Sequence, residues 1–188
     1  MSDKEHVKIL RLGADVWNEW REDQFYLAPD LSGEDLRDTQ VGQCYLGNAR
    51  LRAANLSGMD LRKVQLHDAD LSQANLNEAN LSECVLTSAN LFLASLVRAN
   101  LNRADLQATD FRDANLTEAD LSYTYLGGAV FSGATLSRAN LKAATINATT
   151  FGDNDLSSVE GLISLKHGGP SIIGIQTLYR LSSGLTES

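Results

Sequence analysis

The sequence has few cysteines, prolines and aromatic residues, and it has no long apolar run. Only 6% of its 188 residues are aromatic, and it contains two prolines and two cysteines. Two cysteines cannot form a disulfide framework. No apolar run approaches the roughly 20 residues of a membrane span, and the first residues lack the apolar core of a secretory signal. We therefore expect a cytoplasmic protein with no membrane partner.

Positive charge is also scarce. The formal net charge is −8, and residues 30–160 carry 17 acidic groups against 10 basic ones. A nonspecific nucleic-acid binder or a protein bound to anionic lipid needs a basic surface. We therefore expect no direct binding to nucleic acid.

Combinations of residues that carry chemistry are missing as well. The three histidines lie far apart, and no Cys-x-x-Cys pair, nucleophile elbow or metal-ligand spacing occurs. Neighbouring carboxylates such as Asp110 and Asp113 fall at solvent-facing positions, where nothing raises the pKa as general acid catalysis requires. Cys44 and Cys84 fit small buried hydrophobic residues better than a redox or metal pair. We expect no catalytic residues, no metal and no cofactor.

What the sequence does contain is a repeat of five residues. Every fifth residue from Leu31 to Leu156, 26 positions in all, is Leu, Val, Ile or Phe. The position two residues earlier is Ala at 15 of the 26, and the one between is Asn or Asp at 15. The unit reads Ala-(Asp/Asn)-Leu-x-x. Such self-similarity at a fixed period indicates a repeat architecture.

A period of five fits neither a helix nor a strand. Five residues of α-helix turn about 500°, so successive leucines would form no stripe. On a strand, a step of five would send each leucine to the opposite face. The pattern survives only if the chain turns every five residues, with Leu and Ala pointing inward. Asn and Asp suit such turns because their side chains bond to nearby backbone.

The sequence also indicates how many units complete one coil. Phe111, Phe131 and Phe151 share the central position and are 20 residues apart, so they stack if a coil has four sides. An outward column at the same spacing alternates in charge: Glu78, Arg98, Glu118, Arg138. We predict four sides and 20 residues per coil, with about six and a half coils from the 26 units. Parallel crossovers are nearly always right-handed, so the coil should be too.

The repeat resembles the pentapeptide-repeat family, especially its cyanobacterial members, over residues 29–159. The resemblance implies a right-handed quadrilateral β-helix. Glu34 and Asn154 depart from the pattern at inward positions near the two ends, where we expect burial to be least. Four other residues replace the inward alanine and predict wider or less regular first coils: Cys44, Met59, Val64, Cys84.

Residues 1–28 and 160–188 flank the repeats. Residues 4–22 predict one amphipathic helix, because four apolar side chains recur at helical spacing: Val7, Leu10, Ala14, Trp17. We expect this helix to cap the open end of the coil, with partner docking by Trp17 and Trp20 as the alternative. The C-terminal segment is a second cap or a tail, in which residues 172–181 could pack as a strand or short helix.

Surface recognition is the remaining function. We expect a protein-interaction or regulatory scaffold that is a monomer or weak dimer and has an unknown protein partner. The candidate surface is the most apolar outward group: Val85, Phe92, Leu93, Val97. Alternatively, the C-terminal segment covers it.

A second possibility is mimicry of DNA, because quinolone-resistance relatives of this family bind DNA gyrase. Duplex DNA carries one negative charge per ~1.7 Å, so a rod of about 30 Å would need about 18 negative charges to imitate a duplex of the same length. The repeats carry nearly that number of acidic groups but also 10 basic ones. The mixture of signs makes a poor copy of DNA.

Overall fold

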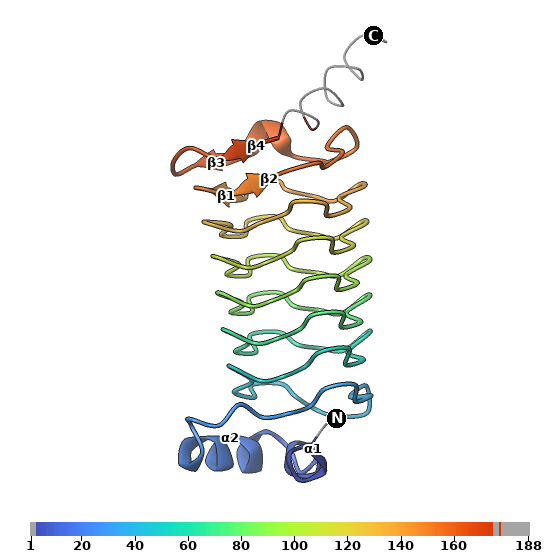
Figure 1. Cartoon of the computed structure of the whole chain (residues 1–188), viewed down its shortest axis with the longest axis vertical. Helices are drawn as coiled ribbons and strands as arrows, with labels where there is room; N and C mark the ends of the chain where they lie inside the picture. The colour runs from blue at the N-terminus through green and yellow to red at the C-terminus, as the bar shows by residue number, and fades with distance from the viewer. Residues whose placement is uncertain (1–2, 175–176, 178–188) are drawn as a thin grey trace.

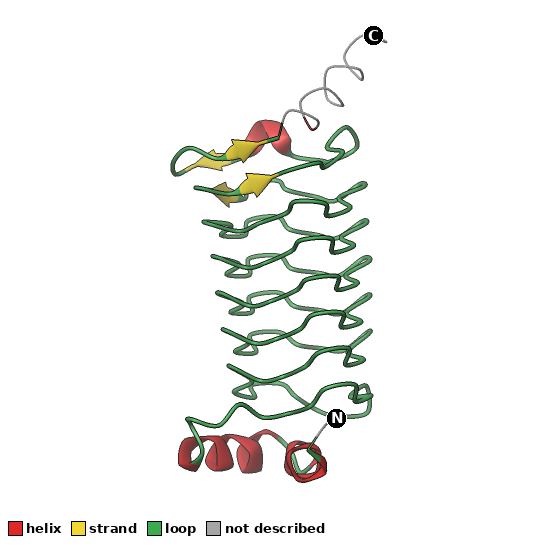
Figure 2. Cartoon of the chain, in the orientation of Figure 1, coloured by secondary structure: helices red, strands yellow, loops and turns green. Residues whose placement is uncertain are grey.

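The computed structural model describes residues 3–174 and 177. The chain forms a stack of coils, with two helices at one end and an irregular segment at the other (Figure 1). Parallel bridges join residues 20 positions apart, from Asp30 with Arg50 to Asn140 with Glu160. The coils between the two ends consist of turns and loops (Figure 2). This spacing is the 20-residue coil that the sequence predicts, whereas the right-handed sense stays a prediction.

Each five-residue unit makes one tight turn. The N–H of the inward alanine donates to the carbonyl three residues earlier, as from Ala54 to Leu51 at 3.0 Å. The residue before that alanine lies in the left-handed region, as at Ala53 with a φ of 56°. Its N–H donates to the next coil, where Ser72 accepts at 2.9 Å. Each turn therefore redirects the chain and still contributes to the ladder.

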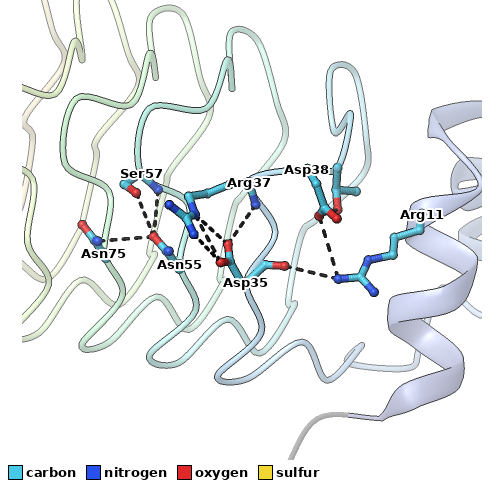
Figure 3. A network of polar contacts seen from close by, with 8 residues as sticks. Arg11, Asp35, Arg37, Asp38, Asn55, Ser57 and Asn75 are labelled. Atoms are coloured by element: carbon cyan, nitrogen blue, oxygen red, sulfur yellow. Dashed lines mark hydrogen bonds and ion pairs between the residues drawn. The ribbon is translucent and has the colours of Figure 1, made fainter.

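The Asn and Asp residues of the repeat bond locally, as their turn-forming chemistry predicts. The side-chain oxygen of Asn55 accepts the N–H of Ser57 at 3.3 Å and its hydroxyl at 2.8 Å. The amide of Asn75, one coil further on, donates to the same oxygen at 3.3 Å (Figure 3). These side chains therefore hold the turn and also link successive coils.

The core is a narrow column of the inward side chains. All 26 residues of the central series are buried. The rings of Phe111 and Phe131 stack with centroids 4.8 Å apart, and those of Phe131 and Phe151 with centroids 5.2 Å apart. Both pairs are nearly parallel, at 4°. This stack is possible only if three residues 20 positions apart lie on one side of successive coils.

Several polar side chains in the core donate to backbone carbonyls, whereas the buried side-chain oxygen of Asn154 accepts no hydrogen bond within the described residues. The hydroxyl of Thr109 donates to the carbonyl of Leu86 at 2.8 Å. Asn154 is fully buried, and its amide donates to two carbonyls at 2.7 Å. The expectation that burial is least at Asn154 is therefore wrong. The chain continues past Asn154, and Thr177 lies over its backbone. The N–H of Asn154 donates to the hydroxyl of Thr177 at 3.1 Å.

The N-terminal segment forms two helices instead of the single helix predicted over residues 4–22. They are α1, Lys4–Arg11, and α2, Ala14–Asp23. The break falls at Gly13, whose φ of 106° is unfavourable for residues with a side chain. Glycine thus allows the sharp change of direction between the two helices.

Both helices lie on the open end of the first coil. Val7, Leu10 and Trp17 are buried, and Ala14 is partly buried against the same core. The indole N–H of Trp17 donates to the carbonyl of Tyr45 at 2.9 Å. Two tryptophans were candidates for partner docking, but Trp17 is fully enclosed and Trp20 packs against it at 5.1 Å. None of the described helices is long and apolar enough to cross a membrane.

The described part of the C-terminal segment extends the parallel ladder. Strand β3, Lys166–His167, pairs in parallel with β1, Thr145–Ile146, and β4, Ile172–Ile173, pairs with β2, Thr150–Phe151. A short 3₁₀ turn, η1, spans Leu162–Ser164. The partner offset grows to 21 and then 22 residues, because the non-repeat sequence needs longer loops. Most of the apolar segment predicted over residues 172–181 lies outside the described residues.

Candidate partner-binding surface

The apolar side chains singled out in the sequence do not form one patch. Leu93 is 47% exposed at the corner of a turn, next to the half-buried Phe92. The guanidinium of Arg112 lies 5.9 Å from the Phe92 ring centroid and covers part of it. Val85 and Val97 are half-buried and belong to other sides of the coil. The exposed part of this surface is therefore the Leu93 corner.

A second surface has exposed aromatic residues. Tyr123 and Tyr125 are 44% and 56% exposed, and they lie beside a shallow hollow of about 500 Å³. We call it the tyrosine hollow, and its lining comes from four successive coils and from β3, which follows them: Glu83, Arg103, Tyr123, Tyr125, Ala143, Thr145, Lys166. Lys166 comes from β3, outside the repeats.

The 20-residue coil explains why these residues meet. Residues 83, 103, 123 and 143 occupy the corner of the same turn in successive coils, and 125, 145 and 166 occupy the neighbouring ladder. Tyr123 has a φ of 61°, so its side chain projects outward from the corner. Ala143 also lines the tyrosine hollow, and its small side chain fills little of that space. The sequence signal for this site is Tyr123 and Tyr125 two residues apart, one coil after Arg103.

The electrostatics of the tyrosine hollow differ from those of the acidic chain as a whole. Glu83 is paired with Lys63 at 3.6 Å, whereas Arg103 and Lys166 have no ion-pair partner among the described residues. The Arg103 guanidinium instead lies over the Tyr123 ring, 5.9 Å from its centroid. A cation over an aromatic face keeps its charge available to a ligand. The tyrosine hollow therefore presents two cations and two phenol groups.

The described residues contain no cluster of three or more His, Cys, Asp or Glu side chains able to hold a metal ion. Four carboxyl groups have a pKa below the usual range, chiefly because an arginine side chain donates to each: Asp35, Asp60, Asp110, Glu118. Burial raises the pKa of the Cys84 thiol to about 12. These shifts favour ionised carboxylates and an unreactive thiol.

Comparisons with known proteins identify the repeat. The family model of pentapeptide repeats matches residues 30–68, 65–91, 94–133 and 114–153, as eight copies. No functionally curated protein gives a significant match.

Solved structures of repeat proteins are also similar to this chain. One is Rfr23 from the cyanobacterium Cyanothece 51142, 34% identical over 50% of this chain and 60% of that one, with a TM-score of 0.38. Another is alr5209 from Nostoc Pcc 7120, 39% identical over 44% of this chain and 68% of that one, with a TM-score of 0.43. QnrB1, a plasmid-mediated fluoroquinolone resistance protein, is 20% identical over 76% of this chain and 81% of that one, with a TM-score of 0.34.

These superpositions are partial, and the match spans less than two thirds of the Rfr23 chain. The assignment therefore rests on the repeat itself, which the family model matches over more than half of the sequence. The chain belongs to the family of pentapeptide-repeat proteins.

Proposed function

We propose that this protein is a non-enzymatic scaffold that binds a protein partner through the outer faces of its coils. It would act as a monomer or weak dimer in a reducing, cytoplasmic environment. The two cysteines are free and buried, which supports the reducing environment. Support for binding comes from the tyrosine hollow.

The observation that carries the proposal is the exposure of Tyr123 and Tyr125 beside Arg103 and Lys166, two cations with no ion-pair partner in the described part of the chain. Tyrosine and arginine are enriched among the residues that dominate interface energies. The coils hold their backbone rigidly, so little conformational entropy is lost when a partner binds. The two cations favour a partner segment that carries carboxylates. The Leu93 corner, two turns further round the coil, is a second candidate surface.

Capture of partners from the native cytoplasm tests the proposal. We expect a Tyr123→Asn, Tyr125→Thr variant to lose the partner that the wild type retains. Asn tolerates the left-handed conformation at 123, and Thr already occupies the equivalent ladder position at 145, so the fold should persist.

A Phe92→Glu, Leu93→Glu variant is the matched control on the other surface. It should retain the partner. Loss in this variant alone would place the interface at the Leu93 corner and contradict the assignment to the tyrosine hollow. A wild-type protein that retains no protein above the level of an unrelated coil-forming control would contradict the scaffold function itself.

DNA mimicry is the alternative, and the surface charges argue against it. Three aspartates of the repeats are neutralised by an arginine two residues later. The pairs, each 2.6 Å apart, are Asp35–Arg37, Asp60–Arg62 and Asp110–Arg112. A duplex has no such internal neutralisation. We expect no inhibition of DNA gyrase supercoiling at micromolar protein, and inhibition that depends on acidic side chains would overturn this choice.

A further inference from the structure

One side of the first coil is not paired with the coil that follows it. On this side, Asp60 is bridged to Asn80, and the ladder continues from there. No bridge joins Gln40 to Asp60, the first pair of the same ladder. The irregular first coil that the sequence predicts is thus an interruption of one ladder.

The interruption leaves backbone groups without partners. Within the described residues, the N–H groups of Val41, Gln43 and Asp60 donate to no protein acceptor. The N–H groups at the same positions one coil later, those of Leu61 and Lys63, donate to the next coil at 2.8 and 3.1 Å. Backbone N–H groups in native proteins are nearly always paired with protein or water. The first and second coils therefore face each other here with open ladder positions.

Contacts with the cap explain why the ladder is open. The amide of Asn18 in α2 donates to the carbonyl of Gln43 at 3.0 Å, and its oxygen accepts the N–H of Tyr45 at 2.9 Å. On the other side of the interruption, Arg11 in α1 donates to the carbonyl of Asp35 at 3.3 Å and approaches the Asp38 carboxylate at 3.8 Å (Figure 3). Both ends of the open section are thus attached to the helices.

There is space next to these open groups. A hollow of about 520 Å³ is lined by Gly13, Gln40, Gly42, Gly58 and Asp60, among others. A Cβ placed on any of the three glycines would meet no atom within 4 Å. A second hollow of about 350 Å³ adjoins it, sharing Gly42 and Asp60. Another chain can therefore approach the backbone closely along this section.

Charge does not dominate this surface. Arg37 on the rim is paired with Asp35, and Asp60 is paired with Arg62, each at 2.6 Å. The side chains of Thr39 and Val41 are buried. What remains available to a ligand is the backbone of the two coils, the glycines and the exposed side chains of Gln40 and Gln43.

We propose that this open section, residues 38–43 facing residues 57–62, binds an extended segment of another polypeptide by β-strand pairing. In this mode of recognition the main-chain hydrogen bonds supply affinity and the neighbouring pockets select side chains. The paired charges on the rim favour an uncharged segment. The site adjoins the tyrosine hollow, because Glu83 lines both that hollow and the smaller hollow of the open section. It does not depend on the function proposed for the tyrosine hollow.

The free protein provides the first test, by hydrogen exchange of individual amides. We expect the amides of Val41, Gln43 and Asp60 to exchange at least about tenfold faster than those of Leu61 and Lys63. Equal protection of the two sets would show that the ladder is closed in solution and would overturn the proposal.

Peptides selected on the full-length protein from a displayed library of random segments, about nine residues long, provide the second test. The selected peptides should slow exchange at the same three amides. Methylation of alternate backbone nitrogens of a peptide should weaken its binding at least about tenfold, because the added methyl groups remove ladder donors. Peptides that tolerate this change, or a selection in which no peptide protects these amides, would contradict strand pairing.

Two matched glycine variants locate the site. Gly42→Trp fills the open space and should abolish peptide binding. Gly127 holds the same place in its own unit, away from the cap, and a Cβ there makes ordinary contacts at 3.7 Å. Gly127→Trp should therefore bind the peptides as the wild type does. The Tyr123→Asn, Tyr125→Thr variant should bind them too, so the two proposed surfaces can fail independently.

Discussion

At the scale of single residues, most turns of the coil hold one residue at positive φ, the turns at Asp38 and Ser158 being exceptions. Among the described residues, 20 non-glycine residues adopt this conformation, with φ between 50° and 65°. None of the residues at these positions is Val, Ile or Thr. A β-branched side chain crowds the backbone there, whereas unbranched and short polar side chains are tolerated. The second of the two variable positions is therefore variable only within this limit, whereas the first accepts β-branched residues such as Val97 and Thr117.

Ser88 tests this restriction, since it is exposed, has a φ of 58° and makes no side-chain hydrogen bond in the described structure. We expect Ser88→Val to lower the free energy of unfolding by about 1–2 kcal/mol more than Ser88→Ala does. Denaturant unfolding of the two variants measures the difference. Equal stability would mean that the turn relaxes to another conformation.

The outward column of alternating charges around Arg98 forms the ion pairs that the sequence predicts, but we expect it to contribute little to the stability of the fold. Arg98 lies 2.8 Å from Glu118 and 3.9 Å from Glu78, and Arg138 also pairs with Glu118. The Arg98 side chain is 62% exposed, so water and salt screen these pairs. We expect Arg98→Ala to shift the unfolding temperature by less than about 2 °C. A larger loss would show that Arg98 binds something else.

At the scale of elements, the N-terminal helices are fixed to the coil by buried polar contacts as well as by apolar packing. The guanidinium of Arg21 donates to the carbonyls of Leu27 and Gly47 at 2.6 and 3.1 Å. Burial lowers the pKa of Arg21, and it has no carboxylate partner among the described residues. By donating to these backbone carbonyls, the buried Arg21 connects α2 to the segment that follows it and to the first coil.

Removal of the cap tests its role. Deletion of residues 1–24 exposes Leu31 and Leu36, both fully buried in the intact protein, together with an unpaired ladder edge. We expect a lower unfolding temperature and association into oligomers, measured by circular dichroism and light scattering, while the central coils keep their β signal. Terminal coils of a solenoid have a neighbour on one side only, so they depend most on such a cap.

The Arg21→Met variant is the milder version of this test. It should lower the unfolding temperature without creating oligomers, because the apolar side of the helices remains in place. A deletion variant that stays monomeric with unchanged melting would show that the helices do not cap the coil. Trp17 and Trp20 would then again be candidates for docking.

At the scale of the whole molecule, stability should depend on pH through the aspartate–arginine pairs. Hydrogen bonds from Arg37 lower the pKa of Asp35 from 3.8 to about 2. Hydrogen bonds from Arg62 and Arg112 likewise lower the pKa values of Asp60 and Asp110. A carboxyl group with a lowered pKa contributes stability that is complete above its unfolded pKa and is lost as the pH falls towards its folded pKa.

We therefore expect the unfolding temperature to stay level from neutral pH down to about pH 5 and to fall only modestly between about pH 4 and 2, because the side chains of Asp35 and Asp60 are more than half exposed and water screens their ion pairs. Thermal melting across this range measures the effect. An Asp35→Asn, Asp60→Asn variant should show a shallower acid fall, because two of the titrating groups are gone. A steep loss above pH 5 would contradict this account.

Much of the architecture follows from the sequence alone, because the repeat leaves only one way to bury every fifth residue. A period of five rules out helix and strand, and the phenylalanines 20 residues apart determine the number of sides. Their rings stack at 4.8 and 5.2 Å in the structure. In this part of the chain each residue contacts the units next to it and the coils above and below, so a local pattern determines the packing.

Outside the repeat, the sequence was a weaker guide. The apolar spacing at Val7, Leu10 and Trp17 predicted the buried face but not the break at Gly13, because glycine inside a helical pattern breaks the helix only where packing requires a turn. Burial of Asn154 depended on Thr177, a residue from beyond the repeats.

The candidate surfaces were decided by tertiary structure. Phe92 is outward by register, yet Arg112 from the next coil partly covers it, and the exposed aromatic residues are Tyr123 and Tyr125 instead. The interruption between Gln40 and Asp60 lies where the N-terminal helices hydrogen-bond to the first coil, as Asn18 does to Gln43. The sequence by itself determined the coil, because inward burial repeats every five residues. Only the tertiary structure decided which outward groups stay open, because side chains from other coils and from the cap cover the rest.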